Sequence, residues 1–136
     1  ANNYFDTYQP PLGIIRVAVL KGRGFRVQKF SMKNDDVPDV YCKVKFGSDE
    51  RNWRTSTVKN TLSPKWANES ADYVLFDVGQ NISIDVWDED DGVVDKDDHL
   101  GSASISVAQI HLQGGIMEVE LDRKGKKTGA FITLTC

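Results

Sequence analysis

The chain has little of what defines several common classes of protein. Only two cysteines, Cys42 and Cys136, occur in 136 residues, which excludes a disulfide-rich scaffold and a CxxC zinc site. No apolar run approaches the ~18 residues of a membrane span, and the net charge of −3 argues against a nucleic-acid partner. His99 and His111 have no serine or cysteine partner in a recognisable catalytic arrangement, so we expect neither an enzyme nor a small-molecule substrate.

The length and composition are those of one globular domain. With 40% hydrophobic and 27% charged residues, a chain of this size can bury a core without metal or disulfide support. The first twelve residues, ANNYFDTYQPPL, contain a Pro-Pro pair and no hydrophobic period. We therefore expect an N-terminal arm or linker over 1–12 and a single domain over 13–136.

Short segments with a two-residue hydrophobic period dominate that domain. In DVYCKVKF (39–46), Cys42, Val44 and Phe46 share one face and the lysines share the other. Such alternation is typical of half-buried strands, and turn residues separate the segments. Strands are expected over 13–20, 39–46, 54–58, 72–78, 82–88, 100–107, 116–122 and 129–136. With one helical turn near 107–112, these strands predict an all-β fold, a two-sheet antiparallel sandwich.

Acidic residues gather where the predicted strands are connected. Residues 88–98 read DEDDGVVDKDD, in which seven of eleven are acidic, and Asp36 and Asp39 precede the strand that begins VYCKV. If these loops meet at one end of the sandwich, their carboxylates repel, and a bound hard cation relieves the repulsion. Calcium, with six to eight oxygen ligands in flexible geometry, fits better than magnesium, and zinc lacks its usual histidine and thiolate ligands here. The spacing is not that of an EF-hand.

Four motifs, in this order along the chain, resemble the calcium- and lipid-binding C2 domain. They are IRVAVLKGRGF (15–25), DVYCKV (39–44), RTSTVKNTLSPKW (54–66) and DVWDEDD…DDHLG (85–101). The last of them is similar to the V-W-D-x-D…D-x-x-G calcium loop of that family. The resemblance covers nearly the whole chain, from about Gly13 to Cys136. It implies an eight-stranded antiparallel Greek-key sandwich in the second of the family's two circularly permuted topologies.

The first loop departs from the commoner pattern of the family. Lys33 stands where that pattern has an aspartate, and the sequence offers D-V-P-D (36–39) instead. This motif is similar to the first loop of the C2 domain of cytosolic phospholipases. In that subgroup an asparagine six residues before the second-loop tryptophan is also a calcium ligand, and Asn60 precedes Trp66 by six residues here. The likeness is to a module and not to an enzyme, because the chain contains no phospholipase catalytic domain.

The resemblance implies a site for two calcium ions between the loops. The implied ligands are Asp36, Asp39, Asn60, Asp88, Asp90 and Asp98. Because the third loop is two residues longer than usual, Asp95 or Asp97 is an alternative to Asp98, and Asp35 is an alternative to Asp36. Bound calcium would leave coordination positions open for lipid phosphates. The candidates for insertion into the membrane are the apolar loop residues Phe30, Met32, Val93 and Val94.

A second candidate site is a basic strand face. In some C2 domains a lysine-rich face binds phosphoinositides, and phosphates suit lysine and arginine through charge-assisted hydrogen bonds. The corresponding residues here are Tyr41, Lys43, Lys45, Arg54 and Lys59. Outward lysines also occur as solvated or edge-protecting residues, so the plain structural interpretation stays open.

Together these features predict a calcium-dependent module that binds a phospholipid membrane surface. We expect it in the cytoplasm, as a peripheral membrane protein when calcium binds. One alternative is a calcium-insensitive protein-interaction module whose acidic loops bind a basic partner, and another is the membrane-targeting domain of a larger lipase or pore-forming protein. Two glycosylation sequons, at Asn68 and Asn81, and the absence of an initial methionine keep a secreted origin open.

Overall fold

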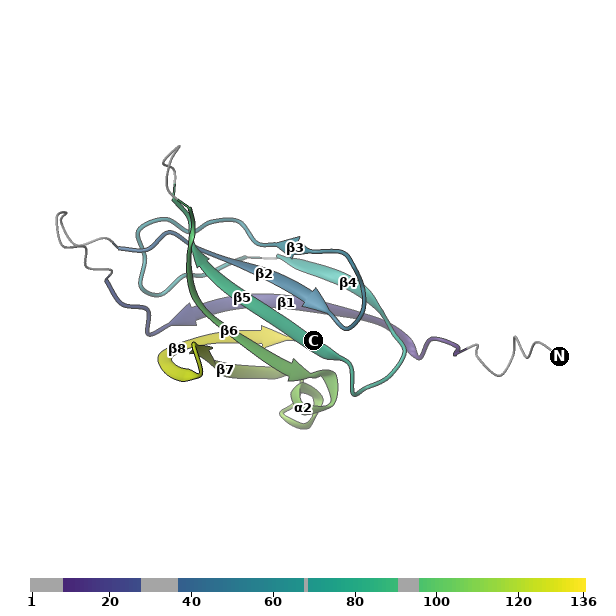
Figure 1. Ribbon diagram of the computed structural model, residues 1–136. Helices are drawn as coiled ribbons and strands as arrows, with labels where there is room; N and C mark the ends of the chain where they lie inside the picture. Colours follow the sequence, from purple (N-terminus) through teal and green to yellow (C-terminus); the bar gives the residue numbers. More distant parts are fainter. Residues whose placement is uncertain (1–8, 28–36, 68, 91–95) are drawn as a thin grey trace.

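The computed structural model describes residues 9–27, 37–67, 69–90 and 96–136. The elements in this part of the chain are β1 (Gly13–Arg23), β2 (Val40–Phe46), β3 (Trp53–Arg54), β4 (Ser70–Leu75), β5 (Asn81–Asp88), β6 (Asp98–Ser106), α2 (Val107–Leu112), β7 (Ile116–Arg123) and β8 (Lys126–Thr135). The strands run along the length of the molecule, and the connections gather at its two ends (Figure 1). In these ranges no helix is long and apolar enough to cross a membrane.

The strands form because their side chains alternate between core and solvent. Along β2, Cys42 and Val44 are buried while Lys43 and Lys45 are exposed. A strand turns successive side chains to opposite faces, so this period buries one face of each strand. The inward residues of all the longer strands join one hydrophobic cluster, which includes Trp66, Ile84 and Leu134. The alternation that predicted strands therefore also predicted the core.

The eight described strands are hydrogen-bonded in the order β3-β2-β5-β6-β7-β8-β1-β4, and the paired neighbours are antiparallel. Pairing between β6 and β7 is reduced to a single register pair, Ser102 opposite Asp122. The order therefore divides into two four-stranded layers at this seam, and the inward faces of both layers supply the common core. The predicted antiparallel β-sandwich is confirmed, and the first strand pairs with both the last strand and β4.

One strand is much shorter than the sequence predicts. A strand was expected over 54–58, but β3 contains only Trp53 and Arg54. The reason lies at Thr55, whose hydroxyl oxygen accepts the N–H of Cys42 at 2.9 Å, so a side chain replaces a backbone acceptor in the ladder. Pairing with β2 resumes only at the isolated bridge between Val58 and Val40.

The predicted helical turn near 107–112 is confirmed as α2. Ser106 precedes it, and the Ser106 hydroxyl accepts the N–H of Gln109 while the Gln109 side chain accepts the N–H of Ser106. This reciprocal capping box satisfies donors that have no partner within the helix. Val107 and Ile110, three residues apart, are buried on one face, which anchors the short helix over the core.

Candidate metal centre

Three strand ends bring acidic residues together at one end of the sandwich. Asp88, the last residue of β5, lies opposite Val40 at the start of β2 and opposite Asp98 at the start of β6. Asp39 directly precedes Val40, so its carboxylate also belongs to this end. Because β2 and β6 both begin where β5 ends, Asp39 and Asp88, which are 49 positions apart in sequence, become neighbours.

The centre of this group is Asp88, which is only 5% exposed. It is the one charged side chain among the buried residues of the described ranges. Its Oδ1 accepts the backbone N–H of Asp39 at 2.9 Å. Burial of a carboxylate is unfavourable unless it is hydrogen-bonded or bound to a cation, and this backbone bond orients Asp88 toward the first loop.

Asp39 connects the first loop to the segment that contains Asn60. The Oδ1 atom of Asp39 accepts the backbone N–H of Asn60 at 2.8 Å, and the backbone carbonyl of Asp39 accepts the N–H of Glu89 at 2.8 Å. Asn60 has a φ of 52°, a conformation that asparagine tolerates better than most residues. Hydrogen bonds from backbone N–H groups to carboxylates therefore hold Asp39, Asn60 and Asp88 next to one another.

Asp97 and Asp98 have different surroundings although they are neighbours. The Asp97 carboxylate accepts the N–H of Asp90 at 2.9 Å and the hydroxyl of Tyr41. These two hydrogen bonds, the one from Asp90 first, lower the pKa of Asp97, whereas burial and the bond to Asp97 raise the pKa of Tyr41 to about 12. Asp98 is exposed and faces Asp88 across the β5–β6 ladder. Both carboxylate oxygens of Asp97 thus serve to fasten the loop.

A second layer of contacts supports this arrangement from outside. The Arg54 guanidinium lies 3.6 Å from the centroid of the Tyr41 ring and pairs with the carboxylate of Glu89. Glu89 also accepts the Thr57 hydroxyl at 2.6 Å, and this bond, together with Arg54, lowers the pKa of Glu89. Sequence reasoning did not identify Glu89 or Thr57, because a contact across more than thirty positions leaves no local pattern.

Several predicted site residues lie outside the described residues. They are Phe30, Met32, Asp35, Asp36, Val93, Val94 and Asp95. Among the residues that are described, no three carboxylate, histidine or thiol side chains are grouped closely enough to hold a metal ion. What this part contributes is a set of oxygen donors at one end of the sandwich, which is the chemistry of a site for a hard cation such as calcium.

The predicted basic face is open in part. Lys43 and Lys45 are exposed on β2, and the Lys43 ammonium lies 5.5 Å from the centroid of the Trp87 ring. Tyr41 is 2% exposed beneath Arg54, and the charge of Arg54 is balanced by Glu89. The exposed, cationic part of this face is therefore centred on the two β2 lysines, and Tyr41 contributes to the loop contacts instead.

Comparison with known proteins gives a consistent result. A family model described as "C2 domain" matches residues 13–122. Extended synaptotagmin-3 of Mus musculus is 33% identical over 101 residues, which cover 74% of this chain and 11% of that protein. The chain therefore spans about a tenth of the length of its curated relatives.

Two solved structures show the same fold. A calcium-bound structure of two consecutive domains of extended synaptotagmin 2, the A and B domains of this family, matches with a TM-score of 0.71 and 24% identity, over 94% of this chain and 46% of that one. Human GIVD cytosolic phospholipase A2 matches with a TM-score of 0.70 and 18% identity, over 93% of this chain and 16% of that one. The likeness to a phospholipase therefore concerns a small part of that enzyme.

Proposed function

The chain belongs to the C2 domain family, and from that premise we propose that it is a module that binds phospholipid membranes when calcium occupies the acidic end of its sandwich. It acts by binding and not by catalysis. The observation that carries the proposal is the position of Asp88, a carboxylate 5% exposed that lies beside Asp39 and opposite Asp98. Carboxylates gathered at one end of the sandwich favour a bound cation, because a cation reduces their mutual repulsion.

The proposed ligands are Asp39, Asn60, Asp88, Asp90 and Asp98, with Asp36 from the first loop. Between Asp97 and Asp98 we choose Asp98, since both oxygens of Asp97 already accept hydrogen bonds. Two calcium ions would add four positive charges to this end and turn it from repelling lipid phosphates to attracting them. Calcium binding is therefore proposed to act as an electrostatic switch.

Membrane contact is proposed to involve the loops and the basic face. Phe30, Met32, Val93 and Val94 are the candidates for entering the membrane interface, where each fully buried side chain would contribute about 1.5–3 kcal/mol. Lys43 and Lys45 are exposed on the adjoining face and would attract anionic head groups.

The wider context is also a proposal. Because the chain spans about a tenth of its curated relatives, we propose that modules of this kind recruit a larger protein to a membrane, from the cytoplasmic side. The calcium-bound state of a neighbour with a similar fold supports calcium as the proposed cation.

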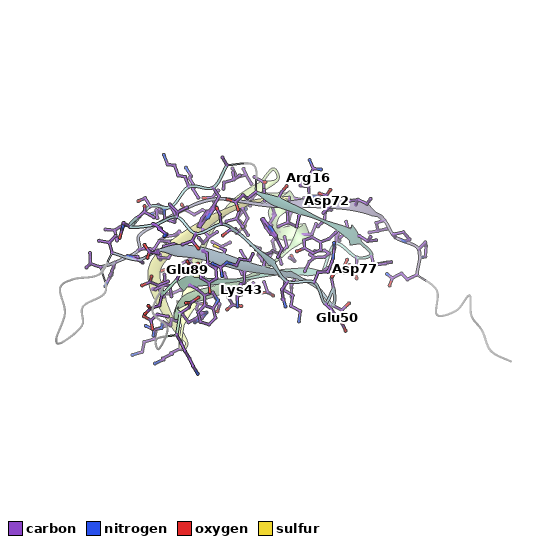
Figure 2. All side chains as sticks on the ribbon, turned by 90° about the horizontal axis from the view of Figure 1, so that it is seen from above. Arg16, Lys43, Glu50, Asp72, Asp77 and Glu89 are labelled. Atoms are coloured by element: carbon purple, nitrogen blue, oxygen red, sulfur yellow. The ribbon has the colours of Figure 1, made fainter. Side chains whose placement is uncertain are left out.

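The test is a melting curve with calcium and with a chelator, followed by liposome sedimentation under the same conditions. A ligand at ~100 times its Kd should stabilise the fold by ~2.7 kcal/mol, and the double variant Asp88→Asn/Asp90→Asn should lose that increase. Glu50→Gln/Asp77→Asn removes the same charge from exposed positions at the opposite end of the molecule and should keep it (Figure 2). No calcium-dependent shift in wild type would refute the proposal and favour a protein-binding role for the acidic loops.

A further inference from the structure

A pocket of about 170 Å³ lies at the same end of the sandwich as the acidic residues, but on another side. It is formed where β1 ends, β6 begins and β7 turns into β8. The residues that line it are Gly24, Phe25, Arg26, Leu100, Arg123, Thr128 and Ala130. None of these residues belongs to the proposed calcium site or to the basic face of β2.

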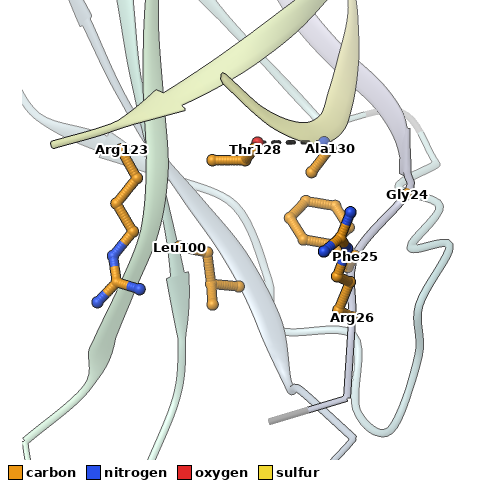
Figure 3. A pocket seen from close by; sticks show the side chains of 7 residues that line it. All are labelled: Gly24, Phe25, Arg26, Leu100, Arg123, Thr128 and Ala130. Atoms are coloured by element: carbon orange, nitrogen blue, oxygen red, sulfur yellow. Dashed lines mark hydrogen bonds between the residues drawn. The ribbon is translucent and has the colours of Figure 1, made fainter. Parts of the chain in front are cut away.

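The pocket has an apolar floor between two arginines. Figure 3 shows Arg123 on one side and Arg26 with the Phe25 ring on the other, and Leu100 between them. The hydroxyl of Thr128 donates to the carbonyl of Leu121 at 2.8 Å and accepts the N–H of Ala130 at 3.1 Å, so it shapes the wall. The groups left to contact a ligand are therefore the guanidinium groups and the apolar floor.

The backbone is built to form this pocket. Gly24 has a φ of 82°, and a Cβ atom there would lie 2.2 Å from the carbonyl oxygen of Gly129. Only glycine permits so close an approach between the end of β1 and the start of β8. After the turn at Gly24, Phe25 is buried and Arg26 lies over Gly129. A Cβ atom placed on Gly129 would lie 3.7 Å from the Nη2 atom of Arg26.

The two arginines of the pocket differ from the other arginines in having no acidic partner among the residues that the structure describes. Elsewhere each guanidinium pairs with a carboxylate: Arg16 with Asp72, Arg23 with Glu118, Arg51 with Asp49 and Arg54 with Glu89. Within the described ranges, neither the Arg26 nor the Arg123 side chain forms a hydrogen bond or ion pair. Two guanidinium cations whose charge no carboxylate balances therefore line one apolar pocket, and this arrangement favours the binding of an anion.

The hairpin beside the pocket carries further positive charge, at positions where the local backbone structure disfavours it. Arg123 and Lys126 are register partners on β7 and β8, and like charges directly opposite each other destabilise a strand pair. Lys124 and Gly125 form the two-residue turn with φ values of 52° and 78°, where asparagine or aspartate usually precedes the glycine. Lys127 pairs with Asp122, which leaves Arg123, Lys124 and Lys126 without an acidic partner among the described residues.

We propose that this pocket binds the phosphate group of a phosphomonoester, and that it does so without calcium. The guanidinium groups would each donate two parallel hydrogen bonds to phosphate oxygens, and the apolar floor would contact the carbons next to the phosphate. The volume is below the ~300–1,000 Å³ of pockets for drug-sized ligands, which favours a single head group. If the phosphomonoester is the head group of a membrane lipid, this inference rests on the proposed function, because the pocket and the acidic loops would then contact the same membrane surface.

The experiment uses the 136-residue chain in chelator, with vesicles of phosphatidylcholine with or without phosphatidic acid. Glycerol 3-phosphate and inorganic phosphate, titrated by calorimetry and amide NMR, are the soluble probes. The test variant is Arg26→Gln/Arg123→Gln. The control variant Arg16→Gln/Arg51→Gln removes the same two charges from exposed positions outside the pocket. Melting curves confirm that every variant is folded.

We expect the pocket variant to bind phosphatidic acid vesicles at least ~10-fold more weakly than wild type, with the control variant close to wild type. The double variant Asp88→Asn/Asp90→Asn should still bind these vesicles in chelator. The test of the pocket is therefore independent of whether the proposed calcium site exists. Binding of vesicles without binding of the soluble probes identifies a lipid as the source, and tight binding of the soluble probes identifies a free phosphomonoester. Equal losses in the pocket variant and the control variant, or no binding of any probe, would overturn the proposal.

Discussion

The hydrogen bond between Tyr41 and Asp97 allows a sharp test of how the loop end is held together. Tyr41→Phe removes the hydroxyl that donates to Asp97 and leaves the ring under Arg54 in place. A hydrogen bond to a charged group contributes about 1.5–3 kcal/mol, and the half-buried Asp97 regains some of it from water. We therefore expect the free energy of unfolding to fall by about 1.5 kcal/mol.

The expected shift in melting temperature follows from the size of the chain. An unfolding entropy of about 2.1 cal/mol/K per residue, over 136 residues, converts that loss to a decrease of about 5 °C. The pKa of Asp97 is lowered in the folded state, so the stability that its ionised form provides is present above ~4 and is lost as the pH falls. The difference between wild type and Tyr41→Phe should therefore narrow in acid.

Tyr73→Phe is the matched control, because it makes the same chemical change at another buried tyrosine. Within the described ranges the Tyr73 hydroxyl is buried and has no hydrogen-bond partner. Removing a buried, unsatisfied hydroxyl should leave stability unchanged or raise it. The measurement is thermal unfolding of the three proteins at neutral and acid pH. If Tyr73→Phe costs as much as Tyr41→Phe, or if Tyr41→Phe melts with wild type, the reasoning about this hydrogen bond is wrong.

Two further predictions concern the backbone and the thiols. Gly24→Ala should destabilise the fold by several kcal/mol, through a positive φ and a Cβ 2.2 Å from the Gly129 carbonyl oxygen. Gly79→Ala is the control, because Gly79 has no positive φ and its Cβ would meet only the side chain of Asp77, at 3.3 Å; it should cost far less, and equal effects in denaturant unfolding would contradict this reasoning. Burial raises the pKa of both free thiols, Cys42 far more than Cys136, so a thiol reagent should label Cys136 first and Cys42 only as fast as the protein unfolds. Rapid labelling of Cys42 in the folded protein would disprove this.

Much of the fold could be predicted because strand formation and burial have the same local signal. The alternation in 39–46 identified both the strand and its inward side chains, Cys42, Val44 and Phe46, which are buried. The early end of β3 was not predicted, because it depends on the Thr55 hydroxyl and its contact with the backbone of Cys42. A side chain that replaces a ladder acceptor has no hydrophobic period to reveal it.

The candidate site, too, could be predicted from the sequence only in part. The hydrophobic period placed Asp39 and Asp88 at predicted strand ends, and the resemblance to the C2 domain implied their role as ligands. Antiparallel pairing brings the end of β5 to the start of β2. The support of the loop by Tyr41, Arg54 and Glu89 depends on side-chain conformations across three segments, which the sequence does not encode locally. The arginine-lined pocket was missed for a similar reason: Arg26 and Arg123 meet only because β1 and β7 are both neighbours of β8.

The pairing of the first strand with the last determines how the module responds to mechanical force. β1 begins and β8 ends on the same side of the sandwich, away from the acidic loops, with Ala18 opposite Thr135 and Arg23 opposite Phe131. Tension applied through the two chain ends therefore separates these strands from one end, and the hydrogen bonds of the ladder break one after another instead of sharing the load. Separation begins where Ala18 lies opposite Thr135 and reaches the Gly24 turn last. The part of this strand pair next to the acidic loops therefore stays paired longest under load.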